Sequence, residues 1–190
     1  LLNGLGDLYE KGLIKEIGLS NTGPKRLIFL YRKLKERGIK INSVQMQLSL
    51  LTKPTIEEEK IKNICFENNI EYLAYSPLAL GILTIPPHKS PKPSTFLRQK
   101  LFQNILPKTI ELRTLLRNIG KKYSASQAQV ALNWVRSHGV KPLVGIRNPL
   151  QAKDAISALN WSLTKKEKER LDFHRKNCPI YMPQNPFTSP

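Results

Sequence analysis

The sequence predicts an α/β fold in which short parallel strands alternate with helices. Four apolar, strand-like runs are each followed by a stretch of helical periodicity, and each run closes on a short polar signature. These signatures lie at residues 18–21 (GLSN), 44–47 (VQMQ), 74–78 (AYSPL) and 144–148 (VGIRN). Alternating strands and helices are typical of parallel sheets with helical crossovers. In a (β/α) barrel the binding site forms where the strands end, so we expect the four signatures to converge on one site.

The length of the chain predicts part of such a barrel. Its 190 residues can form one domain with a sizeable core, but four βα units are only about half of the eight in a closed (β/α)8 barrel. A helical stripe of apolar residues already runs from Leu1 to Tyr9. We therefore expect the C-terminal half of a longer protein, with the half barrel at residues 1–176 and a surface or mobile tail at residues 177–190.

Short apolar segments predict the strands. They cover residues 14–19, 39–46, 70–75 and 141–146, and turn residues bound them. Residues 85–95 contain four prolines and few large apolar side chains, which predicts a long loop. Such a loop is a lid or substrate wall, or an ordinary surface excursion, and the sequence leaves both interpretations open.

Start and stop signals bound the helices. Helical stripes of apolar residues end at Gly12, Gly38 and Gly139, as expected of glycines at helix C-termini. Capping-box spacing, with Glu or Gln three positions further on, is found at Thr55, Ser126 and Thr164. A further helix is expected after Asn148 and Pro149, an N-cap residue followed by a proline in the first turn.

The composition is strongly basic, with 31 Lys and Arg against 14 Asp and Glu and a net charge of +17. Such a balance is compatible with a nucleic acid, a membrane surface or an anionic ligand as partner. The lysines are scattered over nearly every expected helix and form no arm or patch interleaved with aromatic residues. This pattern favours solvated helix faces and disfavours nucleic acid as the partner.

Cysteine usage and hydropathy restrict the compartment. Cys65 and Cys178 do not make a disulfide framework in a chain of this length, and Cys65 lies on the apolar stripe of a helix, where a buried thiol is expected. The longest apolar stretch, residues 73–83, is interrupted and too short to span a bilayer. We expect a protein of a reducing compartment with no membrane partner: cytoplasmic, or in the plastid stroma if the source is a plant or alga.

An anion site is expected at the fourth signature. Arg147 precedes a helix that contains Lys153, and the free N–H groups and positive dipole end of a helix start suit a phosphate. Arginine adds planar recognition of phosphate oxygens. The alternative is an exposed arginine at a helix start with no ligand.

Hydrogen-bonding and aromatic side chains end the other three runs. Ser20, Asn21 and Gln45 can each donate and accept hydrogen bonds, which suits a ring that bears an amide, although each is also a common turn or capping residue. Tyr75 ends an apolar run, where its ring could stack on a planar ligand or pack in the core.

Taken together, these residues resemble the aldo-keto reductase family over essentially the whole chain, and most closely its cyanobacterial and plant-plastid branch. The matching motifs are residues 18–21 (GLSN), Gln45, residues 75–78 (YSPL) with residues 81–83 (GIL), residues 128–134 (AQVALNW) and residues 161–164 (WSLT). The resemblance implies a (β/α)8 TIM barrel that binds NADP(H) and transfers a hydride between the nicotinamide and a carbonyl or alcohol.

The resemblance also implies roles for individual residues. Ser20, Asn21 and Gln45 would hold the carboxamide and Tyr75 would stack on the nicotinamide. The remaining implied contacts are Ser76, Leu78 and Gly81 to the pyrophosphate and ribose, Gly145, Ile146, Arg147 and Gln151 around the adenosine 2′-phosphate, and Asp154 near the adenine. The asparagine usual after that acidic residue is Ala155 here, which is a departure from the family pattern.

The family's catalytic Asp, Tyr, Lys and His would lie upstream of Leu1, so we expect no catalytic residue in this chain, which would be inactive alone. His88, His138 and His174 do not replace them. We therefore expect the cofactor-binding half of an NADP-dependent enzyme that reduces aldehydes or ketones. Its partners would be a small carbonyl substrate and the missing N-terminal half. The alternative is a catalytically inactive, nucleotide-binding regulatory or interaction protein of the same fold.

Overall fold

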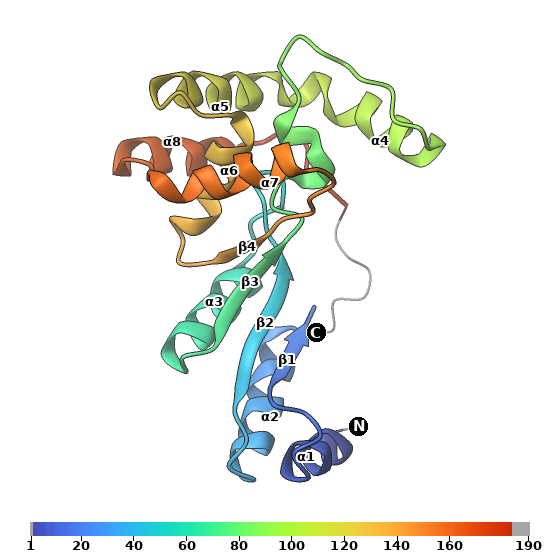
Figure 1. Cartoon of the computed structure of the whole chain (residues 1–190), viewed down its shortest axis with the longest axis vertical. Coiled ribbons are helices and arrows are strands. Elements are labelled where there is room, and N and C mark those ends of the chain that lie inside the picture. Colours follow the sequence, from blue (N-terminus) through green and yellow to red (C-terminus); the bar gives the residue numbers. More distant parts are fainter. Residues whose placement is uncertain (1, 184–190) are drawn as a thin grey trace. The chain divides into compact units, whose positions relative to one another are not determined.

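The chain divides into two compact units, each with its own core. The computed structural model describes residues 2–183. The first unit comprises the described residues up to Gln47 together with Thr55–Leu73, and the second comprises Leu48–Pro54 and the described residues from Ala74 onward. Within the described part, four strands form one sheet in the order β1-β2-β3-β4 (Figure 1). The expected α/β class is confirmed.

The first unit alternates helices with the first strands. Its elements are α1 (Leu2–Glu10), β1 (Ile17–Ser20), α2 (Pro24–Lys35), β2 (Ile41–Gln47), α3 (Ile56–Glu67) and the start of β3 (Glu71–Tyr75). The core contains Leu27, Val44, Ile61 and Cys65, each with an exposed fraction of 1% or less. The expectation of a buried thiol at Cys65 is therefore confirmed, and burial raises its pKa to about 12.

The first strand is shorter than the 14–19 segment predicted. It begins at Ile17, which pairs in parallel with Ile41, the first residue of β2. Residues 14–16 therefore have no strand residue of β2 opposite them. Further along, Ser20 pairs with Gln45, so the ends of the two strands lie next to each other.

The second unit carries most of the helices. After the end of β3 come η1 (Ala79–Thr84), α4 (Phe96–Ile105), η2 (Pro107–Thr109), α5 (Ile110–Lys122), α6 (Gln127–Arg136), β4 (Lys141–Leu143), α7 (Pro149–Ser157), η3 (Ala158–Asn160) and α8 (Lys165–Lys176). Its core includes Trp134, Leu116 and Leu171, which are fully buried.

Three features of the second unit differ from the sequence predictions. Helix α4 was not expected, since its first turn exposes Phe96 and Leu97 and breaks the apolar stripe. Strand β4 ends at Leu143 and not at residue 146, because beyond it the backbone N–H of Arg147 donates to the side chain of Gln151 and not to a strand. The start of the tail is packed, with Met182 buried and its N–H donating to the Leu51 carbonyl; residues 184–190 lie outside the described residues.

The predicted caps account for four helix starts. The side chains of Thr55, Ser126, Asn148 and Thr164 each accept a hydrogen bond from the backbone N–H three residues further on. The reciprocal half of a capping box is present at Thr164, where Glu167 returns the contact. At Ser126 the side chain of the predicted partner Gln129 does not return the contact. Its Nε2 donates to Asp154 Oδ1 of α7 instead.

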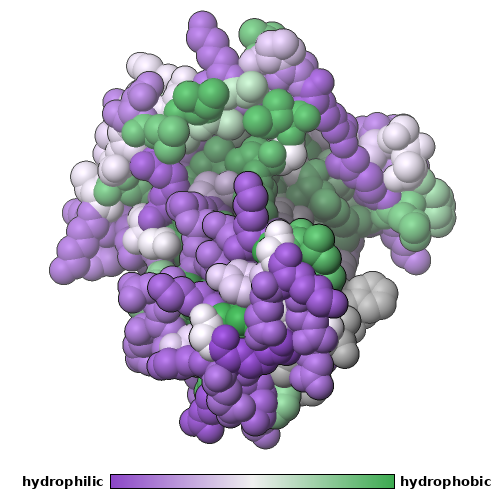
Figure 2. Space-filling model, turned by 60° about the horizontal axis from the view of Figure 1, so that its bottom comes forward, coloured by the Kyte–Doolittle hydropathy of each residue, from purple (hydrophilic) through white to green (hydrophobic). Residues whose placement is uncertain are grey.

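The surface is polar over large areas. Hydrophilic residues cover most of the lower part of the face in Figure 2, and apolar residues gather above it. No helix among residues 2–183 is both long and apolar enough to cross a membrane.

Candidate functional site

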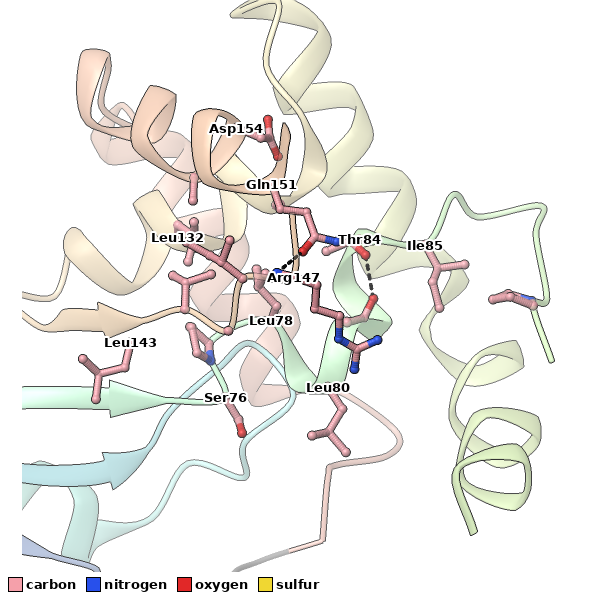
Figure 3. A pocket seen from close by; sticks show the side chains of 18 of the residues that line it. Ser76, Leu78, Leu80, Thr84, Ile85, Leu132, Leu143, Arg147, Gln151 and Asp154 are labelled. Atoms are coloured by element: carbon pink, nitrogen blue, oxygen red, sulfur yellow. Dashed lines mark hydrogen bonds between the residues drawn. The ribbon is translucent and has the colours of Figure 1, made fainter. Parts of the chain in front are cut away.

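A cavity of about 830 Å³ lies within the second unit. Its walls come from the segment after β3, from η1, α4 and α6, and from β4 and α7 with the loop between them (Figure 3). Two of the four polar signatures, residues 74–78 and 144–148, contribute to these walls. The cavity therefore lies where β3 and β4 end.

The segment after β3 makes a tight left-handed turn. Ser76, Ala79 and Leu80 have φ values of 54°, 49° and 55°, and Gly81 follows with 91°. Positive φ is uncommon for residues other than glycine, and such strain is concentrated at functional sites. The N–H of Gly81 donates to the Leu78 carbonyl at 2.9 Å and the Thr84 hydroxyl to the Gly81 carbonyl at 2.8 Å. The turn thereby brings Ser76, Leu78 and Gly81 to the cavity wall.

Arg147 is oriented by the start of α7. Its backbone N–H donates to Gln151 Oε1 at 2.9 Å, and the Gln151 N–H donates to Asn148 Oδ1 at 2.9 Å (Figure 3). Pro149 opens the helix. These contacts fix the loop that carries Gly145, Ile146 and Arg147, all of which line the cavity.

A second arginine, Arg98 on α4, was missed by the sequence reasoning. It lines the cavity, donates from Nη2 to the Leu80 carbonyl at 2.9 Å and lies over the Phe102 ring. Its Nε is buried and has no hydrogen-bond partner among the described residues. Because α4 itself was not predicted, no sequence signal placed this cation next to the turn at Leu80.

Two of the three ionisable side chains that line the cavity are cationic. Its ionisable lining side chains, within the described part of the chain, are Arg98, Arg147 and Asp154. Arginine does not release its proton near neutral pH, and Asp154 accepts hydrogen bonds from Ser126 Oγ at 2.8 Å and Gln129 Nε2 at 2.7 Å. Residues 2–183 also hold no cluster of side chains suited to a metal ion.

The other predicted site residues form a second group in the first unit. The Asn21 backbone N–H donates to the Gln45 carbonyl at 3.0 Å, and Asn21 Nδ2 donates to Ser20 Oγ at 3.1 Å. Tyr75 ends β3 in the second unit and is not among the residues that line the cavity, and neither is the exposed Lys153. The structure thus brings together Ser20, Asn21 and Gln45 as one set and the residues of the cavity as another.

Comparison with known proteins identifies the class. A model of the aldo/keto reductase family matches residues 1–176, so the chain belongs to the aldo/keto reductase family.

Individual relatives agree with this assignment. The chain is 41% identical over 187 residues to "Pyridoxal reductase, chloroplastic" of Arabidopsis thaliana, covering 98% of this chain and 51% of that protein. It is 24% identical to a 9,11-endoperoxide prostaglandin H2 reductase of Trypanosoma cruzi, over 88% of this chain and 48% of that protein. The crystal structure of an aldo-keto reductase from a deep-sea metagenome library has a TM-score of 0.63 at 17% identity, over 97% of this chain and 56% of that one. The chain spans about half the length of the curated relatives it matches.

Proposed function

We propose that this chain is the cofactor-binding half of an oxidoreductase that uses NADP(H) to reduce aldehydes or ketones to alcohols. The observation that carries the proposal is the cavity of the second unit. Two arginines from separate elements line it, together with residues of the left-handed turn after β3. Membership of the aldo/keto reductase family supports carbonyl reduction as the reaction.

The lining residues fit a dinucleotide with an additional phosphate. Arg147 beside the start of α7 suits the adenosine 2′-phosphate, because a guanidinium binds phosphate oxygens in a planar fashion. The buried Nε of Arg98 has no hydrogen-bond partner in residues 2–183, which suits a pyrophosphate oxygen beside Ser76, Leu78 and Gly81. An added Cβ at Gly145 would meet nothing within 4 Å, so this wall is open to a ligand.

Residues that do not line the cavity would hold the redox end. We propose that Ser20, Asn21 and Gln45 bind the carboxamide of the nicotinamide, because their side chains supply both donors and acceptors. We also propose that the Tyr75 ring stacks on the nicotinamide. When bound, the nicotinamide supplies or accepts the hydride.

No catalytic residue is assigned within this chain. Among the described residues that line the cavity there is no His, Cys, Lys or Tyr, and His138 Nε2 is hydrogen-bonded to Asp172 Oδ1 at 2.9 Å. Carbonyl reduction needs a proton donor near the substrate oxygen. In this proposal that donor is a residue outside this chain.

An aldehyde is the substrate class we favour. The relative from Arabidopsis thaliana is named a pyridoxal reductase, and pyridoxal is an aromatic aldehyde. We propose a reducing compartment, the cytoplasm or in a plant or alga the plastid stroma. The free thiols of Cys65 and Cys178 and the chloroplastic relative support this placement.

Coenzyme binding to an Arg147→Ala variant tests the proposal. In the intact protein, we expect NADPH affinity to fall about tenfold to a hundredfold, as for a lost hydrogen bond to a charged group, with little change for NADH. The matched control is Arg117→Ala, which removes an exposed arginine of α5 outside the cavity. Equal losses for both coenzymes would contradict the role in phosphate binding. NADPH binding without turnover of pyridoxal or any other aldehyde would favour the inactive regulatory alternative.

A further inference from the structure

The outer face of α2 combines exposed apolar side chains with cations. Phe29 is 56% exposed and Ile28 is 37% exposed. Residues three and four positions apart are neighbours on a helix surface. At those positions on either side of Phe29 every residue is an exposed cation, and the exposed Lys35 follows one turn beyond Ile28. We call this set the basic face of α2: Lys25, Arg26, Ile28, Phe29, Arg32, Lys33 and Lys35.

The charge of this face is not balanced by its own helix. Helix α2 contains no acidic residue. Lys33 pairs with Glu36 just beyond the helix end at 2.8 Å, and none of the other cations of the face forms an ion pair within residues 2–183. The face therefore carries a concentrated positive charge around an exposed aromatic ring.

Acidic residues of the two neighbouring helices have partners of their own. Asp7 and Glu10 of α1 are bonded to Arg37 at 2.7 and 2.8 Å. In α3, Glu59 is bonded to Lys62 at 2.8 Å. These acids therefore leave the cations of α2 without neutralisation.

The basic face is not an unfinished part of the core. The opposite side of α2 buries Leu27 and Leu34, which are 0% and 1% exposed. Helix α2 also packs between α1 and α3 of the same unit (Figure 1). The basic face is thus the side of α2 that the described residues of its own unit leave open.

The shape of this face favours a lipid surface over other anionic partners. A helix that reads double-stranded DNA enters a groove, which α2 cannot do while α1 and α3 flank it. Single strands and peptides are bound in grooves, and this face contributes no residue to the cavity described above. Lysine and arginine around an exposed phenylalanine suit anionic headgroups with an apolar boundary beneath them.

We propose that the basic face of α2 binds an anionic lipid surface, with its cations on the headgroup phosphates and with Phe29 and Ile28 at the boundary to the acyl chains. This inference is independent of the proposed function. The expectation of no membrane partner rested on the lack of a stretch that could span a bilayer, and a surface contact needs no such stretch. The sequence did not single out this face, because helical spacing and not adjacency in the chain brings its cations around Phe29.

Sedimentation of the intact protein with lipid vesicles tests the proposal. One set of vesicles consists of phosphatidylcholine alone, and the other contains about a third of the anionic phosphatidylglycerol. We expect the anionic vesicles to bind at least about tenfold more tightly, with a loss of affinity as salt is added. Equal affinity for both sets, or binding to neither, would overturn the inference.

Paired variants separate the basic face from the general charge of the chain. One basic side chain near an anionic surface changes affinity about fivefold, so Lys25→Gln with Arg32→Gln should weaken binding about twentyfold. The control is Lys121→Gln with Arg170→Gln, which removes the same charge from exposed positions of α5 and α8 and should change affinity less than about threefold. Equal losses in the two double variants would show that net charge alone matters and would contradict the proposal.

The aromatic ring has its own test. Phe29→Ser should weaken binding to the anionic vesicles about threefold to tenfold, because it removes an apolar side chain from the lipid boundary. Phe173→Ser on α8, where the side chain is 64% exposed, is the control and should leave the affinity unchanged. An unchanged affinity in Phe29→Ser would contradict a contact with the boundary.

Two further measurements complete the test. Should the first double variant unfold, Arg26→Gln with Lys33→Gln removes the same charge from the face and should give the same loss. Poly-glutamate is the probe for an acidic protein segment. Binding of poly-glutamate through these cations, without binding of the anionic vesicles, would assign the face to an acidic protein and overturn the lipid contact.

Discussion

Single side chains join the helices of the second unit, and Glu167 is the clearest case. Burial alone would raise the pKa of Glu167, but hydrogen bonds from Tyr123, Thr164 and Lys122 outweigh it and lower the value to about 2. The spacing of Thr164 and Glu167 predicted this cap. The contact to Tyr123, which lies 44 positions away, has no local signal.

Glu167 should therefore stabilise the fold in a pH-dependent way. Its pKa is 4.5 when unperturbed and about 2 in the folded chain, so the stabilisation is complete above about pH 5 and is lost as the pH falls toward 2. We expect Glu167→Gln to reduce the free energy of unfolding at pH 7 by roughly 1–3 kcal/mol and by much less near pH 2. Urea unfolding at several pH values measures this, with the exposed Glu169→Gln as control. A loss of equal size at pH 7 and pH 2 would contradict the electrostatic origin.

At the scale of elements, local signals predicted most helices and failed where contacts between distant residues decide the structure. The caps at Thr55, Asn148 and Thr164 are confirmed because capping is a local hydrogen bond. Helix α4 depends on contacts with segments elsewhere in the chain, whereas β4 ends early where the Arg147 N–H bonds locally to Gln151. A distant contact also positions Arg98, whose partner carbonyl at Leu80 lies 18 positions away.

Arg113 of α5 holds the chain on either side of α4. It is 1% exposed and donates to the carbonyls of Ile85, Pro86 and Leu106 at 3.2, 2.8 and 2.7 Å. Burial lowers the pKa of its guanidinium. Arg113→Ala removes one donor from each of these carbonyls together with a buried side chain, and it should reduce the free energy of unfolding by roughly 2–4 kcal/mol. Urea unfolding is the measurement, and Arg117→Ala on the same helix, where the side chain is exposed, should change stability by less than about 0.5 kcal/mol.

At the scale of the whole molecule, open strand edges and exposed apolar side chains favour association, and the net charge opposes it. Strands β1 and β4 end the described sheet, and open strand edges favour association. Apolar side chains near β4 are exposed as well, with Leu143 at 39%, Ile146 at 48% and Leu150 at 78%. The net charge of +17 opposes association by mutual repulsion.

We therefore expect the 190-residue chain on its own to associate more strongly as salt is added. Salt shortens the range of the repulsion to about 8–10 Å at physiological strength and leaves the apolar contacts intact. Light scattering after size exclusion, at low and moderate salt, measures this. Leu150→Lys should reduce the association, and Ile28→Lys on α2, an exposed apolar position of the first unit, is the control. A chain that stays monomeric at every salt concentration would contradict the expectation.

The hydrogen bond from Gln129 to Asp154 of α7 also gives the protein an optical signal of its own. The chain has two tryptophans, of which Trp134 is fully buried and Trp161 is half-exposed. Trp161 stacks on Tyr123 with ring centroids 4.3 Å apart and donates its indole N–H to the glutamine that holds Asp154. Any movement of α7 that disturbs this glutamine changes the surroundings of one indole ring. The fluorescence of Trp161 can therefore report the state of the cavity wall without an added label.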